Sequence, residues 1–217
     1  MNKTVIWGLI IIAAVLGIWY FSTTSEAPEA QEPVDGSVSE LQDGTYELAT
    51  TQSSIEWTGS KTLIKDYYDT GTLAFSNGSV SVSGGAIVDG AFTVDMNSFA
   101  VLSTSNTKVP GSNLAGHLKS ADFFDIATYP TATIDLVSVV DGTVTADVTI
   151  KGITKQVTFP AVITQEGNTI TASAQTTIDR TLWDIRYGSS KFFGELGDNV
   201  INDNVDLKLS LVATKTQ

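Results

Sequence analysis

The feature that most constrains this chain is an alternation of apolar and polar residues that recurs between residues 55 and 211. Ile55 and Trp57 alternate with polar neighbours, and the pattern runs longest over residues 144–150 and 205–211. Successive side chains of a strand point to opposite faces, so this pattern is typical of antiparallel strands with one buried and one wet face. The alternation therefore predicts an all-β domain.

Turn signals separate the alternating segments. Three dipeptides are candidates for tight hairpin turns: Asn77-Gly78, Asp141-Gly142 and Gly167-Asn168. A further strand is expected over residues 131–140, directly after Tyr129-Pro130. Many strands joined by short turns indicate either a closed barrel or a two-sheet sandwich, and the alternation alone does not choose between them.

One segment between these strands is expected to be a short helix, over residues 112–120. It begins with Ser112 and Asn113, both favourable N-cap residues. Leu114 and Leu118 are four residues apart and would lie on one helix face. The chain then has one short helix near the middle of an otherwise all-β domain.

Three motifs, in this order, resemble the YceI family of secreted or periplasmic β-barrel proteins that hold long isoprenoid or other lipid chains. They are residues 116–130 (GHLKSADFFDIATYP), 148–159 (VTIKGITKQVTF) and 178–206 (beginning IDRTLWDIRYGSSKFF). The resemblance covers about residues 44–217. It implies an eight-stranded antiparallel, lipocalin-like β-barrel, a size that either fills itself with side chains or encloses one slender ligand.

The N-terminus carries an uncharged apolar run at residues 5–21, with aromatic residues near both ends. At about 1.5 Å per residue a helix there spans about 26 Å, close to the ~30 Å hydrocarbon core of a bilayer. The run ends in Trp-Tyr-Phe rather than in the small residues of a cleavage site. Residues 1–21 are therefore expected to be a transmembrane anchor rather than a cleaved signal peptide, with the domain in the periplasm or at the cell surface.

Residues 22–43 contain six acidic residues and no basic residue, with prolines and serines between them. Such a segment buries too little apolar surface to offset its ordering entropy, so it is expected to be a disordered linker. The remaining residues, 44–217, are enough for one domain. They hold 18 acidic and 11 basic residues. Nucleic acid is not expected as a partner, because phosphate binding needs basic density.

Catalysis and metal binding have little support in the sequence. His117 is the single histidine, and the chain has no cysteine. One histidine cannot supply the nitrogen and sulfur ligands of a zinc site, and no Gly-x-Ser-x-Gly nucleophile elbow is present. No catalytic residue, cofactor or metal ligand is predicted. The resemblance places His117 where it would orient the helix or line the mouth of a cavity.

Eight apolar residues are predicted to point into the barrel, assuming regular alternation along each strand. They are Trp57, Phe75, Phe92, Val94, Ile134, Leu136, Val148 and Phe159. Phe123 and Phe124, taken as strand neighbours, would point to opposite faces, one into the barrel and one beneath the helix. Both could equally be plain core residues.

Arg180 and Trp183 complete the candidate ligand site. The guanidinium of Arg180 could grip a phosphate or carboxylate headgroup, or it could pair with Asp179 or Asp184 and fix the loop. Trp183 makes the same loop aromatic, as at a barrel mouth. The sequence thus predicts a carrier for a long isoprenoid, an isoprenoid quinone or a fatty acyl chain. A ligand-free interaction module of the cell envelope is the alternative, and the oligomeric state is not predicted.

Overall fold

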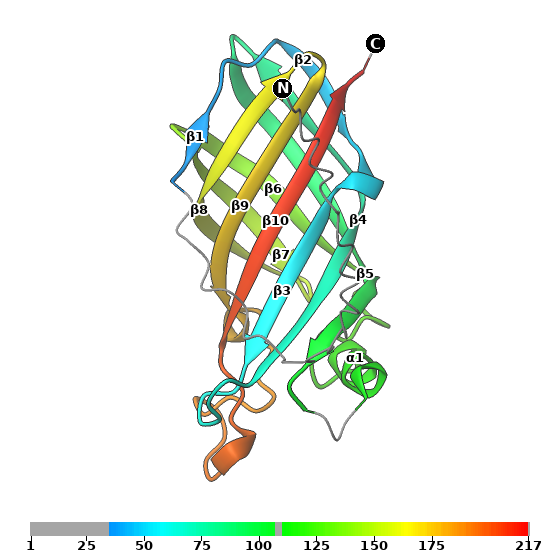
Figure 1. Cartoon of the computed structure of the whole chain (residues 1–217), viewed down its shortest axis with the longest axis vertical. Coiled ribbons are helices and arrows are strands. Elements are labelled where there is room, and N and C mark those ends of the chain that lie inside the picture. The colour runs from blue at the N-terminus through cyan, green and yellow to red at the C-terminus, as the bar shows by residue number, and fades with distance from the viewer. Residues whose placement is uncertain (1–34, 107–109, 217) are drawn as a thin grey trace, which may run out of the picture.

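The structure is a computed structural model that describes residues 35–106 and 110–216, and these residues form a closed antiparallel β-barrel (Figure 1). Seven strand positions are β4 (Tyr68–Ser83), β5 (Ala86–Thr104), β6 (Thr131–Val140), β7 (Thr143–Ile150), β8 (Ile153–Glu166), β9 (Thr169–Asp179) and β10 (Asn204–Lys215). The eighth is shared by β2 (Gly44–Leu48) and β3 (Ser54–Ser60), which both lie between β10 and β4. The prediction of an eight-stranded barrel is confirmed, and the barrel and sandwich alternatives are resolved.

The shared strand position is interrupted by the 3-10 helix η1 (Thr50–Gln52). Ser53, buried just after it, repairs the broken ladder: its hydroxyl donates to the carbonyl of Ala49 (3.0 Å) and accepts from the backbone N–H of Val212 (3.0 Å). A side chain thereby supplies the hydrogen bonds that a regular strand backbone would have supplied.

The ordered domain begins before the predicted boundary at residue 44. The short strand β1 (Ser37–Val38) pairs in parallel with β8, and Leu41 is buried in the barrel core. The predicted linker is therefore wrong over its last residues, while residues 22–34 and the predicted anchor at 1–21 lie outside the described residues. Within residues 35–106 and 110–216, no helix has the length and apolar character needed to cross a bilayer.

Two of the three predicted hairpin turns are confirmed. Asp141 and Gly142 both have positive φ (47° and 74°), as a two-residue hairpin turn requires, and Gly167 also has a positive φ (56°). Asn77-Gly78 is not a turn but lies inside β4, which turns into β5 at Gly84-Gly85 instead. Gly78 is needed there because an added Cβ would lie 2.5 Å from the ring of Phe92.

The predicted helix is confirmed as α1 (Gly111–Lys119), but its cap differs. Pro110 occupies the N-cap position and no side chain caps the helix, so Ser112 and Asn113 do not have the expected role. The helix lies at one end of the barrel, where the β3–β4, β5–β6 and β9–β10 connections also lie (Figure 1). We call this the helix end.

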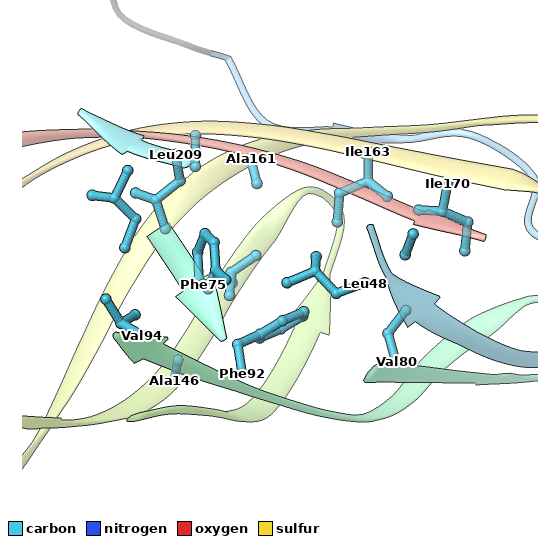
Figure 2. Close-up of a cluster of buried hydrophobic side chains, with 14 of the residues drawn as sticks. Leu48, Phe75, Val80, Phe92, Val94, Ala146, Ala161, Ile163, Ile170 and Leu209 are labelled. Carbon is cyan, nitrogen blue, oxygen red and sulfur yellow. The ribbon is translucent and has the colours of Figure 1, made fainter. Parts of the chain in front are cut away.

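The opposite half of the barrel is filled by its own side chains. Figure 2 shows Leu48, Phe75, Val80, Phe92 and other apolar residues converging from facing strands. The rings of Phe75 and Phe92 meet edge to face, with centroids 6.3 Å apart. This cluster closes the interior on that side and leaves any larger space to the helix end.

Candidate functional site

A cavity of about 430 Å³ occupies the barrel interior at the helix end. This volume lies within the range of small-molecule sites, about 300–1,000 Å³. Its walls are mainly apolar side chains from the barrel strands, among them Ile55, Leu73, Met96, Ile150, Val157 and Leu207. A second space of about 70 Å³ lies within the filled half, and Ile134, Phe159 and Leu209 border both. The described part of the barrel is thus not packed solid.

The eight residues predicted to point inward all border one of these two spaces. Trp57, Val94 and Val148 line the large cavity, Ile134 and Phe159 line both spaces, and Phe75, Phe92 and Leu136 line the small one. The alternation holds at these positions although register shifts interrupt the β4–β5 and β6–β7 pairs close to Phe75 and Leu136. Contact with a ligand at these positions remains a prediction.

An aromatic wall runs along one side of the large cavity. The Trp57 and Phe99 rings have centroids 5.0 Å apart, and Phe99 and Phe124 are 5.3 Å apart. The sequence reading missed Phe99, because a bulge after Met96 shifts the buried face of β5 by one residue. Ser98 holds this bulge: its hydroxyl accepts from the N–H of Ala74 (2.8 Å) and donates to the carbonyl of Asp95 (2.6 Å).

The segment after α1 forms part of the cavity wall at the helix end. Phe123 and Phe124 do not lie on a strand, so the prediction that they point to opposite faces of one is wrong; they lie in a turn. The backbone N–H of Phe124 donates to the carbonyl of Leu118, which folds this turn back against the helix. Both phenylalanines still line the cavity, and Phe123 is buried with Trp183 and Ile185.

His117 joins two segments across the cavity end. Its ring meets Phe123 (centroids 5.1 Å apart) and Tyr187 of the β9–β10 connection (4.7 Å), both edge to face. Its Nε2 lies 3.3 Å from Oδ2 of Asp122. His117 therefore lines the cavity and bridges α1 to the facing loop, and its contact with a ligand remains a prediction.

Arg180 lies in the 3-10 helix η2 (Arg180–Trp183) and is 4 % exposed, with its guanidinium engaged by the protein. It donates to the carbonyls of Asn202 (3.1 Å), Ile185 (2.7 Å) and Ile201 (3.3 Å). It also pairs with Asp203 (3.4 Å), not with the predicted Asp179 or Asp184. Burial lowers the pKa of Arg180, which the neighbouring carboxylates oppose. Arg180 thus ties the beginning of the β9–β10 connection to its end.

Trp183, only 1 % exposed, has a similar holding role. Its indole Nε1 donates to the carbonyl of Val148 (3.1 Å), which ties η2 to β7. Asp179 caps η2 by accepting from the backbone N–H of Thr181 (2.9 Å), and it also pairs with Lys191 (2.7 Å). Burial raises the pKa of Asp179, but the hydrogen bonds from Lys191 and Thr181 outweigh this effect and lower it.

Most polar side chains that border the cavity come from the connections and strand ends of the helix end, while Thr133 and Thr176 lie within strands. Those of the helix end include Lys61, Tyr67, Asp69, Asn113 and Asn199. Burial raises the pKa of Asp69, opposed by hydrogen bonding from Thr104 and by the charge of Lys61. Burial also raises the pKa of Tyr67, and the charge of Asp69 adds to that effect. The site therefore has a deep apolar part and a polar mouth.

This architecture matches solved structures. Burkholderia cenocepacia BcnA shares 22% identity with a TM-score of 0.58, covering 77% of this chain and 99% of its own. A polyisoprenoid binding domain from Saccharophagus degradans, implicated in plant cell wall breakdown, shares 18% identity with a TM-score of 0.55, covering 81% and 100%. At these identities the likeness establishes the fold.

The sequence model of the YceI-like domain matches residues 46–213, which begin within β2 and end within β10. The chain belongs to the YceI-like family. Within that family it is 41% identical over 90 residues to the protein YceI of Escherichia coli O157:H7, which is 37% of this chain and 47% of that protein. It is 40% identical over 77 residues to a UPF0312 protein of Staphylococcus aureus strain N315, which is 33% and 45%. The matched stretch thus spans slightly less than half of these YceI-like relatives.

Proposed function

We propose that this protein holds one long apolar ligand, an isoprenoid, an isoprenoid quinone or a fatty acyl chain, inside the barrel. The observation that carries the proposal is the apolar cavity of about 430 Å³ in an eight-stranded barrel whose other half is filled. The description of the Saccharophagus degradans neighbour as a polyisoprenoid binding domain supports the same ligand class. The role is binding without chemistry.

Affinity would come from burial rather than from polar contacts. Each methylene removed from water contributes about 0.8 kcal/mol, so ten of them contribute about 8 kcal/mol before the costs of association. The aromatic wall of Trp57, Phe99 and Phe124 offers flat apolar surface to such a chain. Most of the polar side chains that border the cavity lie toward the helix end, where the headgroup would rest.

We further propose that residues 5–21 anchor the protein in a membrane and hold the barrel on its extracytoplasmic side. The proposal rests on the uncharged apolar run, its flanking aromatic residues and the acidic residues that follow it. A carrier tethered in this way would stay within reach of the bilayer from which it takes its ligand.

The test is native mass spectrometry of the full chain, purified in mild detergent from a bacterial host, followed by solvent extraction. The carrier function predicts a bound species that releases a long isoprenoid or acyl chain. A bare mass, unchanged after incubation with polyprenyl phosphates, quinones and fatty acids, would contradict it.

One observation favours a second candidate, a ligand-free interaction module. Exposed large apolar side chains gather in the connections of the helix end: Leu63, Leu182, Tyr187, Phe192 and Phe193. Arg186 lies over the ring of Phe192, 4.7 Å from its centroid. Such side chains are typical of contact surfaces, and a bare mass in the experiment above would favour this candidate.

A further inference from the structure

The cavity described above has an unusual balance of charge at its polar mouth. Four ionisable side chains of the Lys, Asp, His and Arg types border it within the described residues: Lys61, Asp69, His117 and Arg180. Whether the site accepts an anionic or an uncharged headgroup depends on how much of their charge is available to a ligand. Each of the four can be traced to its own partners.

Both cations already have partners in the protein. Arg180 is buried and directed at three backbone carbonyls and Asp203. Lys61 donates to the carbonyl of Asp198 (3.1 Å), and its ammonium lies 5.2 Å from the centroid of the Tyr67 ring. A phosphate or carboxylate gains most from cations whose donors are directed at it. The Arg180 donors point at the protein, one of the three Lys61 donors is taken by Asp198, and the charge of Lys61 already acts on Asp69.

The acidic side chain is placed to oppose an anion. Asp69 begins β4 next to Gly59 and Thr104, at the helix end of the barrel. Its Oδ1 is buried and has no hydrogen-bond partner in the described residues. Burial raises the pKa of this carboxyl group, an effect opposed by hydrogen bonding from Thr104 and by the charge of Lys61, so desolvation is the larger influence on it. A second negative charge in the same mouth would add repulsion in a poorly solvated place.

The remaining polar groups suit an uncharged headgroup. The amides of Asn113 and Asn199 border the cavity at the same end, and an amide can both donate and accept hydrogen bonds. His117 faces Asp122 at 3.3 Å, so the imidazole also has an acidic neighbour of its own.

We propose that this site selects long-chain ligands with an uncharged headgroup, such as an alcohol, ester, amide or quinone, and that Asp69 rejects phosphates and carboxylates. The inference rests on the proposed function, because it assigns a headgroup to the same cavity. Selectivity would come from repulsion of anionic headgroups by Asp69 as much as from hydrogen bonds to uncharged ones, a combination that binding sites commonly use.

The test compares two probes with the same twenty-carbon chain, geranylgeraniol and geranylgeranyl diphosphate, bound to the full chain in amphipol. Binding is followed by quenching of tryptophan fluorescence, since Trp57 and Trp183 line the cavity. The wild type should bind the alcohol at least tenfold more tightly than the diphosphate. Asp69→Asn should narrow this ratio at least fivefold, mainly by improving diphosphate affinity.

The matched control is Asp89→Asn, which removes the same charge from an exposed position of β5 near the opposite end of the barrel. It should leave the ratio unchanged. Equal or tighter binding of the diphosphate by the wild type would overturn the inference while leaving the carrier function standing, and this comparison needs no variant. Binding of neither probe by any protein would instead overturn the carrier function on which the inference rests.

Discussion

At the residue scale, Gly71 shows how tightly the cavity wall is built. An added Cβ would lie 1.8 Å from the carbonyl oxygen of Ala100 and 2.5 Å from the indole of Trp57. We expect Gly71→Ala to lower the free energy of unfolding by about 1–3 kcal/mol, the usual cost of overpacking. Gly116→Ala is the control, because Gly116 lies on helix α1 and a Cβ added to it would meet no atom within 4 Å. It should stabilise by about 0.5–1 kcal/mol; equal effects in denaturant titrations would contradict this account.

Asp69 gives a prediction for pH at the same scale. Burial raises its pKa above 3.8, so the folded state holds this proton more tightly than the unfolded chain does. Stability due to this group is therefore lost as pH rises through the raised pKa. Asp69→Asn should raise Tm at pH 7.5, and the gain should disappear below pH 3.8, where the wild-type carboxyl is also neutral. A lower Tm of Asp69→Asn than of the wild type at pH 7.5 would contradict this. It would mean that the hydrogen bonds to the ionised carboxylate stabilise the fold by more than its burial destabilises it.

At the scale of an element, the β9–β10 connection depends on one buried arginine. Removing Arg180 would leave three carbonyls without their donor and the carboxylate of Asp203 with Lys191 as its remaining ion pair. We expect Arg180→Met to cost about 3–5 kcal/mol, as for other broken buried pairs. Arg186→Met, in the same connection but 55% exposed and paired with Asp184, should cost under about 1 kcal/mol. Chemical denaturation of both variants checks this, and similar losses would refute the role of Arg180.

The elements also show where sequence reading works and where it fails. Strands with unbroken alternation, such as β7, and turns with two positive-φ residues, such as Asp141-Gly142, follow local rules and were predicted. Phe99 was missed because a bulge is set by the partner strand rather than by the local pattern. The turn predicted at Asn77-Gly78 was wrong, because Gly78 is required by the close approach of the Phe92 ring from the neighbouring strand and not by a turn. Phe123 and Phe124 carry strand-like residue types, but the turn after α1 holds them.

At the scale of the whole molecule, the division of the barrel into a filled half and a hollow half could not be predicted. The same apolar alternation serves both halves, because Phe75 and Trp57 are equally good inward residues. What separates them is three-dimensional: Phe75 packs edge to face with Phe92 of the neighbouring strand in the filled half, whereas Trp57 packs beside Phe99 on the wall of the large cavity. The closed eight-stranded barrel, by contrast, could be predicted from the three motifs that resemble the YceI family.

The most direct measurement is the number of long-chain ligands bound per chain at saturation, by native mass spectrometry of two matched variants. Leu207→Trp adds bulk to a residue of β10 that lines the large cavity. Val137→Trp adds bulk to an outward residue of β6 that is 52% exposed. The account predicts about one ligand per chain for wild type and Val137→Trp and a large loss for Leu207→Trp. Equal occupancy in all three proteins would place the ligand outside the barrel and contradict the account.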